Sequence, residues 1–138
     1  MSATVLEHYE IKIDCEDDII LVRRKVRDVA QSCKFDVFAA SAVTTAASEL
    51  ARNVWTHAGR GIVRIEKVSD DMRLGVRADF ADQGPGIADV ERALRGGYST
   101  ANSMGLGLSG SKRLVDEFSI DSSPGRGTRV TFVKWARY

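Results

Sequence analysis

The chain has 138 residues, of which 43% are hydrophobic and 28% are charged, with 20 basic and 19 acidic side chains and a formal net charge of +1. This length suits one compact domain over residues 1–138, and the composition excludes intrinsic disorder and a disulfide scaffold. The near-neutral charge argues against a nucleic-acid partner, because such proteins normally carry a basic excess. No signal-like leader or membrane-length apolar run is present, so we expect a reduced, cytoplasmic protein with no membrane partner.

Hydrophobic periodicity predicts the following elements in chain order. Alternation predicts a short strand up to Ile13, and apolar residues spaced three and four apart predict a helix from about 18 to 33. The later elements are a helix near 36–58, strands near 62–68 and 74–80, helices near 89–94 and 108–118, a tight turn at 124–127 and a strand at 128–134. They indicate an α/β two-layer sandwich in which helices cover one face of a mixed sheet.

Glycine-containing motifs cluster in the second half of the chain. They are Asp82-Gln-Gly84-Pro-Gly86-Ile87, Gly105-Leu106-Gly107-Leu108 and Gly125-Arg-Gly127-Thr128, and Glu49-Leu-Ala-Arg-Asn53 lies upstream of them. Each motif alone is weak evidence: the motif at 105–108 is compatible with helix packing, and the motif at 125–128 is compatible with a plain hairpin turn. Their joint order and spacing is much more specific, and long glycine-rich segments in compact domains are usually functional or mobile.

Together these segments resemble the N-box and the G1, G2 and G3 boxes of the ATP-binding fold shared by gyrase, heat-shock chaperone ATPases, sensor histidine kinases and MutL. Within this GHKL superfamily the stretch 48–135 is similar to the small serine kinases of bacterial sigma-factor pathways, especially the RsbT-type switch kinases of the stressosome. The segments 48–53, 82–87, 98–100 and 112–119 carry the likeness. The resemblance implies a Bergerat-type ATP-binding fold with ATP and Mg²⁺ as cofactors.

Glu49 and Asn53 stand four residues apart on a predicted helix, so they project from the same face one turn apart. An amide oxygen from Asn53 suits Mg²⁺, which keeps several waters and takes other ligands from phosphates. Glu49 beside that metal could then act as the general base that accepts a proton from the attacking hydroxyl. Without the glycine motifs the pair would be interpreted as exposed polar residues on a surface helix.

Asp82 ends a predicted strand just before a glycine turn. A buried carboxylate accepts hydrogen bonds, which suits the exocyclic amine of adenine, although an aspartate here can also simply initiate a turn. Gly84 and Gly86 permit close approach of a ligand to the backbone. The resemblance implies that Asp82 contacts adenine and that the hydroxyl of Thr128 supports either Asp82 or the base.

Gly105 and Gly107 are expected to lead into a helix that begins near Leu108, where free N–H groups would bind a triphosphate. The segment from about 88 to 104 is interpreted as a lid over ATP, with the hydroxyls of Ser99 and Thr100 as candidate phosphate contacts. The expected cofactor-binding set is Asn53, Asp82, Gly84, Gly86, Ser99, Thr100, Gly105, Leu106, Gly107, Leu108 and Thr128. The roles of Arg52, His57, Arg92 and Arg95 stay open between site and surface.

The resemblance implies a protein serine/threonine kinase that phosphorylates STAS-domain antagonist or scaffold proteins in a bacterial partner switch. It also implies that the kinase activates a PP2C-type phosphatase by direct binding. The alternative is an anti-sigma factor that sequesters a sigma factor in a nucleotide-dependent way. A histidine-kinase catalytic domain would need a phosphoacceptor histidine on a separate helix, whereas His8 lies in a predicted strand and His57 in the nucleotide helix.

Overall fold

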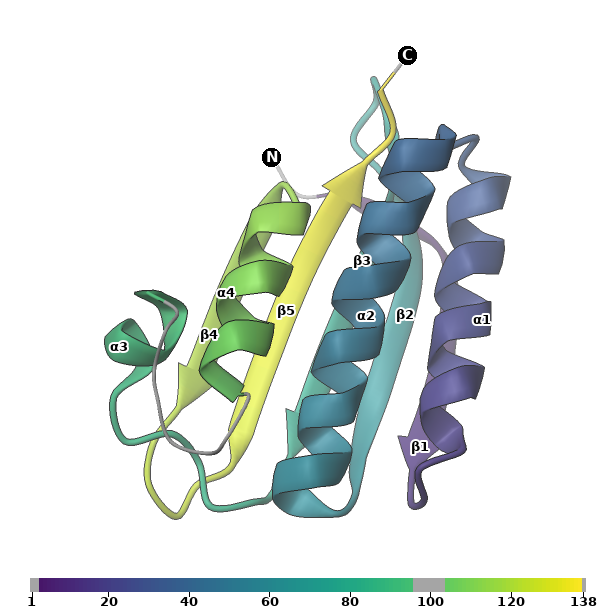
Figure 1. Cartoon of the computed structure of the whole chain (residues 1–138). Coiled ribbons are helices and arrows are strands. Elements are labelled where there is room, and N and C mark those ends of the chain that lie inside the picture. Colours follow the sequence, from purple (N-terminus) through teal and green to yellow (C-terminus); the bar gives the residue numbers. More distant parts are fainter. Residues whose placement is uncertain (1–2, 96–103, 138) are drawn as a thin grey trace.

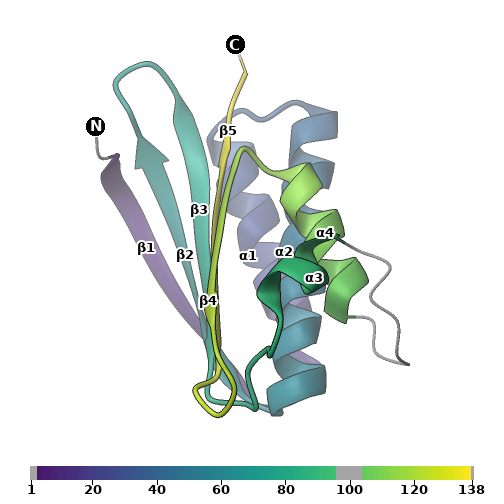
Figure 2. The same cartoon turned by 90° about the vertical axis from the view of Figure 1, so that its left-hand side faces the viewer.

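The structure is a computed structural model that describes residues 3–95 and 104–137 (Figure 1). The strands are β1 (Thr4–Ile13), β2 (Gly61–Ser69), β3 (Leu74–Asp82), β4 (Glu117–Ser122) and β5 (Thr128–Trp135), and the helices are α1 (Asp18–Ser32), α2 (Val37–Ala58), α3 (Val90–Arg95) and α4 (Met104–Leu114). The five strands form one sheet in the order β1-β2-β3-β5-β4. The helices lie on one face of it (Figure 2), which confirms the two-layer α/β arrangement.

A mixed sheet was expected, but all four strand pairs are antiparallel. The connections explain this arrangement. Short turns join β2 to β3 and β4 to β5, which forces antiparallel pairing. Between β1 and β2 the chain runs along α1 and back along α2, so it enters β2 at the end where β1 finished (Figure 1).

Helix α2 has the local signals that fix both of its ends. The side chain of Asp36 accepts a hydrogen bond from the backbone N–H of Ala39 at 2.7 Å, which satisfies a free donor of the first turn. Gly59 ends the helix in the left-handed conformation with φ of 79°. Between these ends, seven residues are buried against the sheet and the neighbouring helices α1 and α4: Ala39, Val43, Ala46, Ala47, Leu50, Ala51 and Val54. This packing fixes the rotation of the helix and therefore the direction of Asn53.

The region around α4 differs from the sequence prediction. A helix from about 108 to 118 was expected, but α4 ends at Leu114 and Glu117–Ser122 form the edge strand β4. The apolar residues Leu114 and Phe118 are four apart, which fits a helix, whereas Phe118 and Ile120 alternate as in a strand; pairing with β5 decides the outcome. The helix also begins at Met104, so Gly105 and Gly107 belong to its first turn and do not precede it.

The main core lies between the sheet and the helices. Phe80 and Phe132 pack there with ring centroids 5.9 Å apart, and both are essentially inaccessible to solvent. On the opposite face of the sheet, Asp79 is buried and accepts hydrogen bonds from Arg129 at 2.7 Å and Thr131 at 2.9 Å. Among the helices of residues 3–95 and 104–137, none is both long and apolar enough to cross a lipid bilayer.

Candidate nucleotide-binding site

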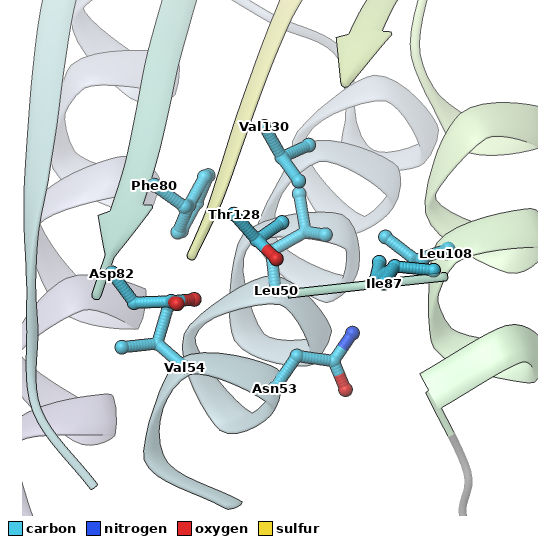
Figure 3. Close-up of a pocket in the computed structure, with 9 residues that line it drawn as sticks. All are labelled: Leu50, Asn53, Val54, Phe80, Asp82, Ile87, Leu108, Thr128 and Val130. Atoms are coloured by element: carbon cyan, nitrogen blue, oxygen red, sulfur yellow. The ribbon is translucent and has the colours of Figure 1, made fainter. Parts of the chain in front are cut away.

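A pocket lies where four segments that are distant in sequence converge. These segments are the C-terminal half of α2, the end of β3 with the loop after it, the first half of α4 and the start of β5 (Figure 3). The lining residues are Leu50, Asn53, Val54, Phe80, Asp82, Ile87, Leu108, Thr128 and Val130. The pocket therefore has an apolar wall with three polar side chains directed into it. Its free volume is about 20 Å³, which is room for about one water molecule, so a larger ligand requires the walls to separate.

Asp82 is the last residue of β3, and its side chain is directed toward the helices (Figure 3). Its Oδ1 accepts a hydrogen bond from the backbone N–H of Gly84 at 2.9 Å. Burial raises the pKa of Asp82, while the N–H groups of Gly84 and Thr128 and the nearby His57 oppose that rise. A carboxylate that is half-buried in an apolar pocket is costly for the fold, which is typical of a group retained for binding.

The glycines of the loop after β3 are required by close packing. A Cβ on Gly84 would lie 2.8 Å from the Cβ of Ala58 at the end of α2. Gly86 has φ of 78°, and a Cβ there would lie 2.0 Å from the backbone oxygen of Ser123. Both glycines let this loop lie directly against neighbouring segments, between Asp82 and Ile87, which line the pocket.

Asn53 reaches the pocket from α2, as the sequence predicted, and its amide is directed into the cavity (Figure 3). Its Nδ2 is buried, and among the described residues it has no hydrogen-bond partner. Buried polar atoms are normally satisfied, so an unpartnered Nδ2 that faces a pocket indicates a ligand that accepts a hydrogen bond from it. Glu49 lies one turn away and is exposed; it lines an open groove between α1 and α2 and does not line the pocket. Arg52 is 3.9 Å from Glu16 in an exposed ion pair.

His57 follows Asn53 by one further turn of α2. Its Nε2 is also buried and lacks a hydrogen-bond partner within the described part of the chain. Burial lowers the pKa of His57, and the negative charge of Asp82 partly counteracts this effect. The end of α2 therefore holds an imidazole with a lowered pKa near the Asp82 carboxylate.

Thr128 is the first residue of β5 and pairs with Asp82 on β3 and with Ser122 on β4. The three side chains therefore form one row across the sheet. Thr128 Oγ1 lies 2.8 Å from Ser122 Oγ, which also lies 2.8 Å from the backbone nitrogen of Ile87. Sequence reasoning did not identify Ser122, because it predicted no strand there. Its position six residues before Thr128 across a tight turn would have identified it once that hairpin was recognised.

The remaining predicted contacts have different outcomes. Leu108 is buried and lines the pocket from α4. Gly105, Leu106 and Gly107 are part of the first turn of α4, whose N–H groups have no partner within the helix and so suit an anion. Ser99 and Thr100 lie outside the described residues. Arg92 and Arg95 lie on α3 and are exposed. Asp89, which directly precedes α3, accepts a hydrogen bond through its side chain from the backbone N–H of Arg92 at 3.0 Å.

These features fit an adenine nucleotide with a bound Mg²⁺. Asp82, Thr128 and Asn53 line the pocket with a carboxylate, a hydroxyl and an amide, and α4, whose first turn begins at Met104, contributes Leu108 to the same lining. Mg²⁺ commonly takes one or two protein oxygens and fills its shell with water and phosphate oxygens. The described residues contain no group of three or more histidine, cysteine, aspartate or glutamate side chains that could hold a metal.

Comparison with known proteins defines the class of protein. The family described as "Histidine kinase-like ATPase domain" matches residues 13–134. The match spans most of the chain, including the pocket. The chain therefore belongs to the histidine kinase-like ATPase family, which confirms the fold class that its motifs predicted.

Individual relatives place the chain more narrowly. It is 42% identical over 127 residues to the serine/threonine-protein kinase RsbT of Bacillus subtilis, covering 92% of this chain and 96% of that protein. The predicted resemblance to RsbT-type switch kinases is thus confirmed. The chain is also 31% identical over 99 residues to the anti-sigma F factor of Caldanaerobacter subterraneus subsp. tengcongensis, covering 67% of this chain and 68% of that protein.

A solved structure shares the fold at much lower sequence identity. The crystal structure of the SiaB-SiaC complex from Pseudomonas aeruginosa contains a chain that matches with a TM-score of 0.56 and 13% identity. The match covers 95% of this chain and 90% of that one. At this level of identity the likeness supports the arrangement of strands and helices alone.

Proposed function

We propose that this protein is an ATP- and Mg²⁺-dependent serine/threonine kinase that acts in the cytoplasm. Its substrates are STAS-domain antagonist or scaffold proteins of a bacterial stress-signalling partner switch. In the same switch it binds and activates a PP2C-type phosphatase. Similarity to RsbT over nearly the whole of both chains supports the kinase activity.

The observation that carries the proposal is the convergence of Asn53, Asp82 and Thr128 in one pocket, where the amide nitrogen Nδ2 of Asn53 is buried and has no hydrogen-bond partner in the described chain. In this proposal Asp82 and Thr128 bind the adenine, and the first turn of α4 binds the triphosphate. Asn53 offers its amide oxygen to Mg²⁺, which would neutralise charge on the transferring phosphoryl group. These residues position ATP, and positioning with charge neutralisation supplies most of the catalysis in phosphoryl transfer.

Glu49 is proposed as the general base. Its exposure on the outer face of α2 leaves it accessible to a hydroxyl that a protein substrate brings to the site. It stands one helical turn from Asn53, so a proton acceptor and a metal ligand lie on the same helix. A substrate protein docked over the open groove that Glu49 lines would bring its serine or threonine hydroxyl within reach of Glu49.

The experiment is transfer of labelled γ-phosphate from ATP to a purified STAS-domain protein from the same organism. We expect transfer by the wild type, a loss of about 100-fold or more in rate for Glu49→Gln with ATP binding retained, and loss of Mg²⁺-dependent ATP binding for Asn53→Ala. Thr56→Ala, an exposed substitution on the same helix, is the matched control and should behave as wild type. Wild-type transfer by Glu49→Gln would refute the base assignment.

The alternative is an anti-sigma factor that uses nucleotide to shape a sequestering surface, and the similarity to anti-sigma F factors favours it as second candidate. The same assay separates the two functions. If the protein binds ATP and captures a purified sigma factor but transfers phosphate to no STAS-domain protein, the anti-sigma function is supported and the kinase activity is refuted. Co-purification of a PP2C-type phosphatase whose activity rises on binding would support the second role of the kinase.

A further inference from the structure

Ser122 lies at a hydrogen-bonded junction behind the pocket. Its Oγ is 2.8 Å from the backbone nitrogen of Ile87, 2.9 Å from the backbone oxygen of Gly127 and 2.8 Å from Thr128 Oγ1. It thereby joins the loop after β3, the turn before β5 and a side chain that lines the pocket. None of the sequence motifs includes this residue.

The hydrogens of this junction can be assigned by counting donors. The N–H of Ile87 can only donate, the carbonyl of Gly127 can only accept, and each hydroxyl has one hydrogen. If Ser122 gave its hydrogen to Thr128, the oxygens of Ser122 and Gly127 would face each other at 2.9 Å without a hydrogen between them. Ser122 therefore donates to Gly127, and Thr128 donates to Ser122. All three contacts are then hydrogen bonds.

This assignment determines what Thr128 presents to the pocket. Its only hydroxyl hydrogen is used behind the pocket, so Oγ1 faces the cavity with lone pairs alone. Asp82 stands beside it in the same row of the sheet and presents a carboxylate oxygen. A pair of neighbouring acceptors matches an amino group, which has two hydrogens, and repels a carbonyl oxygen.

We propose that Ser122 is a positioning residue that selects a 6-amino purine by holding the hydroxyl of Thr128 as an acceptor. The inference rests on the proposed function, because it concerns the base of the nucleotide bound in the same pocket. It adds to that function a residue on β4 that touches no ligand and acts through Thr128.

The test compares two nucleotides: ATP and purine riboside triphosphate, which lacks the 6-amino group. Dissociation constants are measured by calorimetry for wild type, Ser122→Ala, Thr128→Val, the double variant, Ser122→Thr and the control Ser123→Ala. We expect wild type to prefer ATP, and Ser122→Ala to weaken ATP about fivefold to tenfold with purine riboside triphosphate within about twofold of its wild-type value. Ser122→Thr and Ser123→Ala should keep the wild-type preference.

The double variant tests whether the two residues act as one unit. If Ser122 acts through Thr128, its ATP affinity should equal that of the single variants, because removal of the second group then changes nothing further. Equal weakening of both nucleotides by Ser122→Ala, or additive effects in the double variant, would overturn the inference and leave a structural role only. If Ser122→Ala does not fold, the other two variants test the inference. Thr128→Val should lose the preference for ATP over purine riboside triphosphate, and Ser122→Thr should keep it.

The proposed function fails in a distinguishable way. Failure of the wild type to bind either nucleotide would refute nucleotide binding, and the role of Ser122 with it. ATP binding by the wild type with an unchanged preference in Ser122→Ala would refute the role of Ser122 alone.

Discussion

Gly86 and Gly125 provide a controlled test of how tightly the loops around the pocket are packed. Both have φ of 78°, and the N–H of Gly125 donates to the carbonyl of Pro85 at 2.8 Å, so they lie in loops that contact each other. A Cβ on Gly86 would lie 2.0 Å from the backbone oxygen of Ser123, whereas a Cβ on Gly125 would meet nothing within 4 Å. Substitution by alanine therefore introduces the same backbone strain at both positions and a steric clash at only one.

The expected magnitudes follow from these two contributions. A left-handed conformation costs a non-glycine residue about 1–2 kcal/mol, which applies to both variants. Gly86→Ala must also displace backbone, at a further cost of about 1–3 kcal/mol. At about 3 °C per kcal/mol for a domain of this size, we expect Tm to fall by about 3–6 °C for Gly125→Ala and about 6–15 °C for Gly86→Ala.

Thermal unfolding followed by circular dichroism measures both changes, and ATP titration measures their consequence for the site. Gly86→Ala should also weaken ATP binding, because the displaced loop carries Ile87, which lines the pocket. Gly125→Ala should leave ATP binding unchanged. Equal losses of Tm, or a larger loss for Gly125→Ala, would show that these loops yield easily and that the close packing at Gly86 does not define the site.

Two aspartates of β3 give further predictions. Burial raises the pKa of Asp82 above its ordinary value of 3.8. The protonated carboxyl group therefore stabilises the fold at pH values below 3.8, and this contribution is lost as the pH rises through the raised pKa. Asp82→Asn should therefore raise Tm near neutral pH, with a gain that vanishes in acid, while ATP affinity falls about tenfold or more. The exposed Asp28→Asn serves as the control for general charge effects, and a Tm gain independent of pH would contradict the burial argument. Asp79→Ala should lower Tm by about 3–6 °C, because two ion pairs are lost, yet leave the dissociation constant for ATP unchanged. A weakened ATP affinity in Asp79→Ala would show that the two faces of the sheet are coupled.

The long elements of the fold could be predicted from the sequence because their periodicity is unambiguous. Helix α2 has a buried face of small and aliphatic residues, an aspartate at its start and a glycine at its end, so its bounds were predicted almost to the residue. Strand β4 was missed because it is a short edge strand whose apolar residues also fit the end of a helix. Its pairing with β5 is a tertiary contact, and local periodicity carries no information about such contacts.

The residues of the candidate site that belong to sequence motifs could also be predicted. Asn53, Asp82, Leu108 and Thr128 belong to recognisable motifs, and the fold brings them to one pocket. Ser122 was not predicted, because its importance depends on the register that sets it opposite Thr128, and the strand that carries it was missed. The role of Glu49 stays a prediction, because the side chain lies on the outer face of α2 and its function depends on where a substrate protein docks.

Asp79 and Asp82 show why environment, and not residue type, identifies a functional carboxylate. They lie three residues apart on β3 and therefore on opposite faces of the sheet. Asp79 has Arg129 and Thr131 as hydrogen-bond donors and Arg64 within 3.5 Å, so its charge is compensated inside the protein. Asp82 is held by backbone N–H groups in a largely apolar pocket, and burial raises its pKa. A fold selected for stability alone would compensate both charges alike. Asp82 has backbone N–H donors but no ion pair with an arginine or lysine among the described residues, and the unpartnered Nδ2 of Asn53 lines the same pocket. Both groups are best explained by a ligand that forms hydrogen bonds with them.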